Sequence, residues 1–289
     1  MNRKETPLQK TLLFLLFAGP TMLLFIIFIA IPFVYGLYLT LTSWNGYSAI
    51  KEFVGLQNYS GIFKETEFWD SIWLTFRYAI ACVIFVNSIA FLLAYLLTSG
   101  IKGEKFLRAG FFTPNLIGGI ILGFIWKFIF NRVLIMIPLF PSTSFLSNPV
   151  MAFWAMVIVE VWRASGYMLL IYIAGLVGIP NDYIEAARID GANNRQILCR
   201  IRLPLMMQSF TICLFLTLSS AFKVYDMNLT LTEGGPFGAT RMAAMTIFNK
   251  AFTYHNYGMG QAEAVVFFIV MLILAIMQLQ LTRKREVGA

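Results

Sequence analysis

Charged residues, histidine and paired cysteines are scarce in this 289-residue sequence. Only 12% of the residues are charged, about half of the ~25% that is typical of soluble domains. His255 is the single histidine, and Cys82, Cys199 and Cys213 are scattered with no CxxC pair. This spacing favours neither a disulfide framework nor a zinc site, so we expect no metal ligands.

Motifs for nucleotide binding and catalysis are missing as well. The sequence contains no GxxxxGK[ST], no HExxH and no GxSxG. The chain therefore has no loop of its own to hold ATP phosphates, and an intramembrane enzyme would lack obvious catalytic residues. We expect no cofactor in this chain and no enzymatic activity.

Long apolar stretches dominate what is present. Hydrophobic residues make up 59% of the chain, including 28 phenylalanines, and a helix needs about 20 apolar residues to cross a ~30 Å bilayer core. The first stretch is too long for the apolar core of a signal peptide, so we expect it to be retained. The sequence predicts one all-α polytopic membrane domain over 1–289, with six transmembrane helices at about 11–41, 71–97, 106–130, 150–177, 205–229 and 262–281.

The basic residues indicate the orientation of these helices. The net charge is +8, but Lys and Arg lie in short loops between apolar stretches, which does not favour a nucleic-acid-binding face. Thirteen lie at the two ends of the chain and in the loops after the second and fourth stretches, against six in the other loops. The positive-inside rule then predicts a multi-pass protein with both termini in the cytoplasm.

One cytoplasmic loop, 179–204, has strong local signals for structure. Asp182 and Glu185 have the spacing of a capping box, with Asn181 as an alternative cap, and predict the start of a short helix. Gly191 is suited to end that helix because glycine adopts a left-handed conformation at little cost.

A second short helix is expected after this glycine. Asn193 or Asn194 can begin it, and Pro204 interrupts the pattern before the fifth apolar stretch. Small residues on the first helix would allow a partner to approach closely, and Glu185 and Asp190 could pair with basic groups on it. The alternative is an ordinary amphipathic loop that lies on the membrane.

The same loop resembles the EAA signature of binding-protein-dependent ABC importer permeases. The resemblance rests on Glu185-Ala186-Ala187, Asp190-Gly191-Ala192 and Ile201-Arg202-Leu203-Pro204. Further matches to the sugar-transporting branch lie at Gly55-Leu56-x-Asn58-Tyr59, Phe68-Trp69, Trp162-Arg163-x-x-Gly166, Ala174-Gly175-Leu176, Ile179-Pro180, Tyr225-Asp226, Thr232-x-Gly234-Gly235-Pro236, Thr240, Ala251-Phe252 and Tyr257-Gly258.

This resemblance implies a type I ABC importer permease fold with a cytoplasmic coupling helix, in a bacterial plasma (inner) membrane. Such a chain is expected to pair with a second homologous permease, to be driven by two ABC ATPase subunits that hold ATP and Mg, and to receive a sugar from an extracellular or periplasmic solute-binding protein. It is most similar to compact six-span glycerol-phosphate or oligosaccharide permeases, as the first permease of the pair. The residues expected to couple to the ATPase are Glu185, Ala186, Ala187, Asp190, Gly191, Ala192, Ile201, Leu203 and Pro204.

Polar and aromatic residues within the spans are candidates for the substrate path, because such groups are costly in lipid. Bonding between helices or anchoring at the membrane interface is the structural alternative for each. Glu160 and Arg163 can neutralise each other, and Gly119-x-x-x-Gly123 favours close helix packing. The candidates are Asn87, Asn115, Trp126, Glu160, Trp162, Tyr167, Lys223, Tyr225 and Asp226.

Two other transport functions remain open from the sequence. An ion-coupled secondary transporter of small polar solutes would need intramembrane carboxylates, for which Glu160 and Asp226 are the candidates. A permease for amino acids or ions could use the same architecture, and the Gly-Gly-Pro segment favours sugars by resemblance alone.

Overall fold

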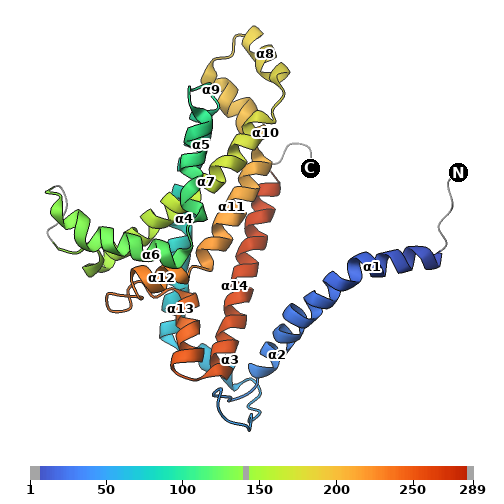
Figure 1. Ribbon diagram of the computed structural model, residues 1–289, viewed down its shortest axis with the longest axis vertical. Helices are drawn as coiled ribbons and strands as arrows, with labels where there is room; N and C mark the ends of the chain where they lie inside the picture. The colour runs from blue at the N-terminus through green and yellow to red at the C-terminus, as the bar shows by residue number, and fades with distance from the viewer. Residues whose placement is uncertain (1–6, 139–142, 285–289) are drawn as a thin grey trace. The chain divides into compact units, whose positions relative to one another are not determined.

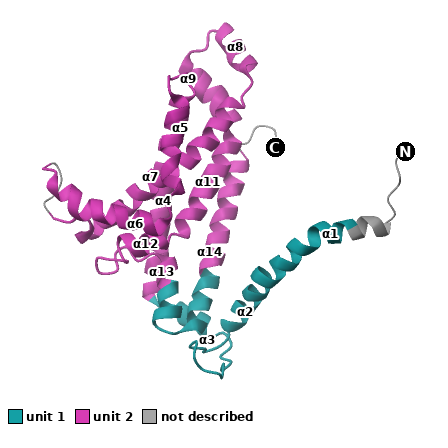
Figure 2. Cartoon of the chain, viewed as in Figure 1, with its two compact units in different colours: residues 1–65, 247–266 teal, residues 66–246, 267–289 magenta. Residues whose placement is uncertain are grey.

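The computed structural model describes residues 7–138 and 143–284, and the side chains from residue 13 onward. The chain forms two compact units, residues 1–65 with 247–266 and residues 66–246 with 267–289 (Figure 2). Within the described residues, five helices are long and apolar enough to cross a membrane, or six if one bent pair counts as a single span. The expected all-helical polytopic fold is confirmed.

Three long helices, α4 (Thr66–Leu97), α7 (Pro149–Val177) and α11 (Met207–Phe222), form the centre of the second unit (Figure 1). Small residues let α4 and α7 approach closely, which increases van der Waals contact where lipid offers no hydrophobic driving force. The fully buried alanines of the two helices include Ala79, Ala90 and Ala94 on α4, and Ala152 and Ala155 on α7.

The third expected span, 106–130, is broken rather than continuous. Helix α5 (Glu104–Phe112) passes into a short 3₁₀ turn at Thr113–Leu116, and α6 (Gly119–Phe128) starts after a gap. Pro114 has no N–H to continue an α-helix, and Gly118 is extended, with ψ at 145°. The apolar pattern did not reveal this break because both halves are apolar.

The fifth expected span, 205–229, is also interrupted. Helix α11 ends at Phe222, and a separate short helix, α12 (Asp226–Leu231), follows. Helix α12 packs against α6 at Gly123, where an added Cβ would lie 1.8 Å from Thr230 Oγ1. The predicted packing role of this glycine pair is therefore confirmed.

The first unit contains α1 (Pro7–Phe25), a π-helical turn at Ile26–Ala30, and α2 (Ile31–Leu39). It also contains α3 (Gln57–Ile62) and a π-helical turn at Asn249–Thr253 that follows α13 (Ala243–Phe248). Helix α14 (Tyr257–Arg283) contributes to both units.

A small network joins the segments of the first unit that follow α2. Asn58 donates from Nδ2 to the carbonyl oxygens of Thr40 (2.7 Å) and Thr42 (2.9 Å). At Gly258 an added Cβ would lie only 1.9 Å from the Thr42 carbonyl oxygen, so this contact requires a glycine. Two of the matched motifs, at Asn58 and Gly258, thus have a structural role here.

Candidate functional site

The loop between α7 and α11 folds into short helices at one end of the second unit (Figure 1). They are α8 (Asn181–Ile189), α9 (Asn194–Ile197) and α10 (Leu203–Leu205), with a π-helical turn at Leu198–Arg202 between the last two. The predicted helix–turn–helix is confirmed.

The start of α8 differs from the predicted capping box. Pro180 occupies the N-cap position, no side chain caps the helix, and Asn181 and Asp182 lie inside the first turn. Pro180 is itself extended and suits the position immediately before a helix, so α8 begins one or two residues earlier in the chain than predicted. Asp182 still favours the helix, because a carboxylate in the first turn complements the helix dipole.

The end of α8 is a complete Schellman motif. Gly191 has φ at +81°, its N–H donates to the Arg188 carbonyl (3.1 Å), and the Ala192 N–H donates to the Ala187 carbonyl (2.9 Å). Two otherwise unpaired carbonyl groups are satisfied, which fixes the direction of the chain as it leaves the helix. The predicted left-handed role of Gly191 is confirmed.

The next helix begins at once with its own cap. The Asn193 side chain accepts from the Gln196 N–H (2.9 Å), and the Gln196 side chain accepts from the Asn193 N–H (2.8 Å). Both N–H groups are satisfied reciprocally, as in a capping box. We call residues 194–205 the second leg of the loop. After it the chain bends by 67° at Met206, two residues after Pro204. The loop is therefore held by main-chain and capping bonds at both turns.

Packing gives α8 one buried face and one free face. Ile184 and Ile197 are buried in the core of the unit, with Ala187 and Ala192 packed against it. The opposite face is exposed at Glu185, Ala186 and Asp190, while Ile201, Leu203 and Pro204 on the second leg are half-buried.

The free face carries two apolar side chains that the sequence prediction missed. Ile189 is 87% exposed and Tyr183 is 56% exposed, on the same short helix as the exposed Ala186. Apolar groups gathered on an exposed surface are typical of an interaction site. The available signal was that no large apolar residue lies three or four positions from Ile189 in the sequence.

Two candidates for the substrate path lie inside the helix bundle. Asn87 accepts from the Tyr172 hydroxyl (2.8 Å) and donates to Thr217 Oγ1 (3.3 Å), so it joins α4, α7 and α11. Glu160 is 2% exposed and forms a bidentate pair with Arg163 at 2.7 and 3.0 Å. These contacts satisfy both side chains within the bundle.

The other candidates lie in different places. Trp126 and Trp162 meet edge to face, with ring centroids 5.5 Å apart, and Tyr167 is 40% exposed on α7. Asn115 is half-buried in the break between α5 and α6. The junction between α11 and α12 brings together Lys223, Tyr225 and Asp226, of which only Tyr225 is half-buried.

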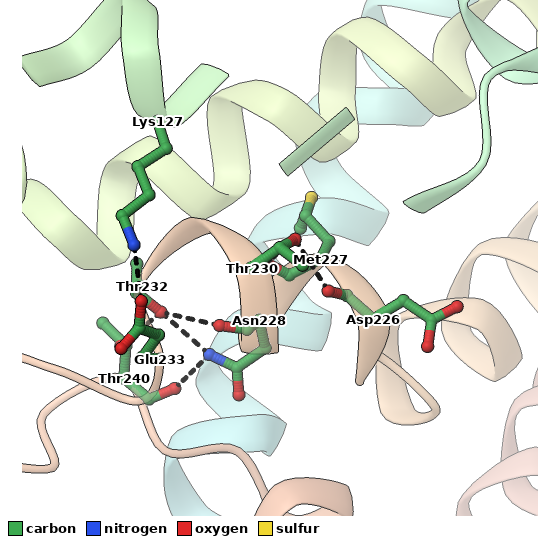
Figure 3. A network of polar contacts seen from close by, with 8 residues as sticks. All are labelled: Lys127, Asp226, Met227, Asn228, Thr230, Thr232, Glu233 and Thr240. Carbon is green, nitrogen blue, oxygen red and sulfur yellow. Dashed lines mark hydrogen bonds and ion pairs between the residues drawn. The ribbon is translucent and has the colours of Figure 1, made fainter. Parts of the chain in front are cut away.

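A network of hydrogen bonds stabilises the turn after α12 (Figure 3). Asn228 is fully buried, donates to the Thr240 carbonyl (2.8 Å) and Thr232 Oγ1 (3.0 Å), and accepts from the Met242 N–H (3.2 Å). The predicted turn at Thr232–Pro236 is present, with Glu233 and Gly234 at positive φ. The sequence prediction overlooked Asn228, although a lone amide in an apolar run, just before a Gly-Gly-Pro turn, was a usable signal.

Together these features define a polytopic membrane subunit with the fold of type I ABC importer permeases. A chain of a bacterial alginate ABC transporter, in complex with an alginate pentasaccharide-bound periplasmic protein, superposes with a TM-score of 0.81 at 20% identity, and 96% of each chain is covered. A chain of the MetNI methionine ABC transporter matches with a TM-score of 0.54 at 20% identity, covering 75% of this chain and 95% of the other. These likenesses show the fold.

The chain belongs to the family described as binding-protein-dependent transport system inner membrane component, whose model matches residues 89–287. It is 41% identical to the probable starch degradation products transport system permease protein AmyD of Thermoanaerobacterium thermosulfurigenes, over 99% of both chains. It is 32% identical to the trehalose/maltose transport system permease protein MalF of Thermococcus litoralis, over 92% of both. The predicted transport permease, an inner-membrane component that works with a separate binding protein, is confirmed.

Proposed function

We propose that this chain forms half of the translocation pore of an ATP-driven importer for a carbohydrate. A second, homologous permease forms the other half, and a solute-binding protein delivers the sugar. ATP and Mg are bound by two partner ATPase subunits, and the energy enters this chain through the loop 179–204. Both termini and this loop lie in the cytoplasm.

The geometry of the coupling loop carries this proposal. The Schellman motif at Gly191 and the capping box at Asn193 fix α8 rigidly to the second leg. Ile184 and Ile197 join both to the core of the unit. A force on the free face of α8 is thus transmitted to α11 as a rigid-body movement rather than lost in a flexible loop.

The free face suits docking into a protein groove. Ala186 leaves room for close approach, and Ile189 and Tyr183 offer apolar area at its edge. Glu185 and Asp190 add carboxylates that can pair with basic groups of an ATPase, while Arg202 lies over the Tyr95 ring at 5.7 Å and links the second leg to α4. An ordinary loop lying on the membrane would need none of these features.

The carbohydrate is proposed from the relatives. Starch degradation products, trehalose/maltose and multiple sugars are in the names of chains 41%, 32% and 29% identical to this one. The substrate itself is best identified by uptake of radiolabelled maltodextrins, with a labelled amino acid as the control. Uptake of the amino acid instead of the sugar would contradict the proposed substrate class.

Co-purification tests the proposed assembly. The tagged chain, expressed with its genomic neighbours, should bring down an ABC ATPase and a second six-span permease. ATP hydrolysis by that complex should rise when binding protein and sugar are added together. Transport by this chain alone in liposomes, driven by an ion gradient, would instead support the secondary-transporter alternative.

A further inference from the structure

Three neighbouring hollows follow one another along α4 in the second unit, the last two between α4 and α7, and we call them together the trough. Its first part, about 440 Å³, lies at the N-terminal end of α4 and is lined by charged and hydroxyl side chains that include Glu67, Asp70 and Arg77. The second part, about 600 Å³, shares Leu74 and Arg77 with it. The two parts therefore adjoin at Leu74 and Arg77.

A third part continues the trough along the same two helices. It encloses about 450 Å³ and shares Phe85 and Trp154 with the second part. Its walls are almost entirely aromatic and aliphatic, with Ser165 as the one hydroxyl among them. The trough is thus charged at one end and apolar over the rest of its length.

Only some of the charged side chains at the polar end form ion pairs with one another. Arg241 pairs with Glu67, whereas Asp70 and Arg77 are exposed and form no ion pair with any side chain in the described part of the chain. They lie seven residues apart on α4, which is two turns or about 10 Å along one helix face. A charged residue within an apolar span usually pairs with another group, and neither Arg77 nor Asp70 has such a pair among the described side chains.

Length and polarity together indicate the kind of ligand. From Arg77 to Leu93 the trough follows α4 for about 24 Å, more than the ~15 Å half-thickness of a bilayer core. A sugar would need several polar groups to fix it, and the walls beyond Arg77 offer almost none. An acyl chain fits these walls, and a headgroup with both charges fits Asp70 and Arg77.

We propose that this trough is a binding site for one zwitterionic phospholipid of the phosphatidylethanolamine type. The phosphate contacts the Arg77 guanidinium, the ammonium contacts the Asp70 carboxylate, and one acyl chain lies along Ile84, Phe85 and Trp154. The site is independent of the substrate and of the side of the membrane on which each terminus lies.

Photo-crosslinking tests the acyl chain. The assembled transporter is placed in nanodiscs of equal phosphatidylethanolamine and phosphatidylglycerol, with a trace of phosphatidylethanolamine that carries a diazirine on one acyl chain. Crosslinks should concentrate on the α4 and α7 peptides that contain Phe85 and Trp154. Ile84→Trp should remove them by filling the trough while Asp70 and Arg77 stay intact. Even labelling over all helices, or labelling unchanged in Ile84→Trp, would overturn the proposal.

Native mass spectrometry of the same complex tests the headgroup. A contact between one basic residue and a lipid headgroup is worth enough to change retention about fivefold. Arg77→Gln should lower retained phospholipid by about that factor, whereas Arg132→Gln, at an exposed arginine outside the trough, should not. Asp70→Asn should abolish the preference for phosphatidylethanolamine over phosphatidylglycerol.

Two results would contradict the assignment directly. Equal retention of both lipids by the unaltered complex would overturn the role of Asp70. A photoreactive amino acid placed at Ile84 that captures a helix of the second permease, instead of lipid, would show that protein covers the trough. Because these measurements do not depend on uptake or ATP hydrolysis, they can fail while the proposed transport function holds, and the reverse.

Discussion

At the scale of single residues, Gly191 is required for its backbone conformation and not for lack of space around it. Its φ is +81°, and no atom lies within 4 Å of the position that a Cβ would take. A β-branched residue there would be strained by about 1–2 kcal/mol without any clash. Gly191→Val should therefore loosen the end of α8 and lower both uptake and substrate-stimulated ATP hydrolysis about tenfold, with normal amounts of the chain in the membrane.

The matched control at this position is Gly191→Asn, because asparagine tolerates the left-handed conformation better than other residues with a side chain. It should retain most of the uptake. If both variants lost activity equally, the requirement would be for a small residue at the ATPase contact, and the conformational explanation would be wrong.

Asn228 is a second residue whose effect follows from its bonds. Asn228→Leu would remove four side-chain hydrogen bonds, one of them to the Met156 sulfur, and leave the Met242 N–H and the Thr240 carbonyl without this partner. Each buried polar group left unpaired costs about 1–3 kcal/mol. We expect a lower melting temperature of the purified complex and faster proteolysis at residues 232–241, while Thr253→Ala, at an exposed threonine, changes neither.

At the scale of helices, the contact between α6 and α12 depends on two glycines, and an added Cβ would meet its neighbours at different distances at the two positions. An added Cβ would lie 1.8 Å from Thr230 Oγ1 at Gly123 but 3.0 Å from the nearest atom at Gly119. Gly123→Ala should therefore lower the thermal stability of the complex more than Gly119→Ala. Adding Thr230→Ala to Gly123→Ala should restore part of the loss, and a lack of any rescue would place the strain elsewhere.

The same helices show how far sequence patterns reach. Apolar length located the first, second, fourth and sixth expected spans to within five residues but not the third and fifth, and Gly191 and Asn193 located the two turns of the loop. The breaks at Gly118 and after Phe222 were missed, because each lies between apolar segments and is stabilised by tertiary contacts. Helix α12 is held by α6 and by the bonds of Asn228, which join residues that no local window compares. The start of α8 was also misplaced, although Pro180 was visible in the sequence. The spacing of Asp182 and Glu185 favoured a capping box, whereas the helix begins after Pro180 without a side-chain cap.

The candidate site was predictable to a similar degree. A polar loop with strong capping signals is recognisable because its determinants lie within about ten residues of one another. The substrate path is harder, since a side chain's neighbours decide its role: Asn87 and Glu160 find partners within the bundle. Their sequence context alone could not distinguish a buried bond from a polar wall of a pore.

At the scale of the whole molecule, the proposed orientation can be tested with the cysteines that the chain already has. Cys199 is exposed in the coupling loop, whereas Cys82 and Cys213 are buried within helices. A membrane-impermeant maleimide should label one thiol per chain in inverted vesicles and none in intact cells, because the loop faces the cytoplasm. Cys199→Ser should abolish this labelling, and detergent denaturation should reveal the two remaining thiols. Labelling of Cys199 in intact cells would reverse the topology and, with it, the proposed docking of a cytoplasmic ATPase on α8.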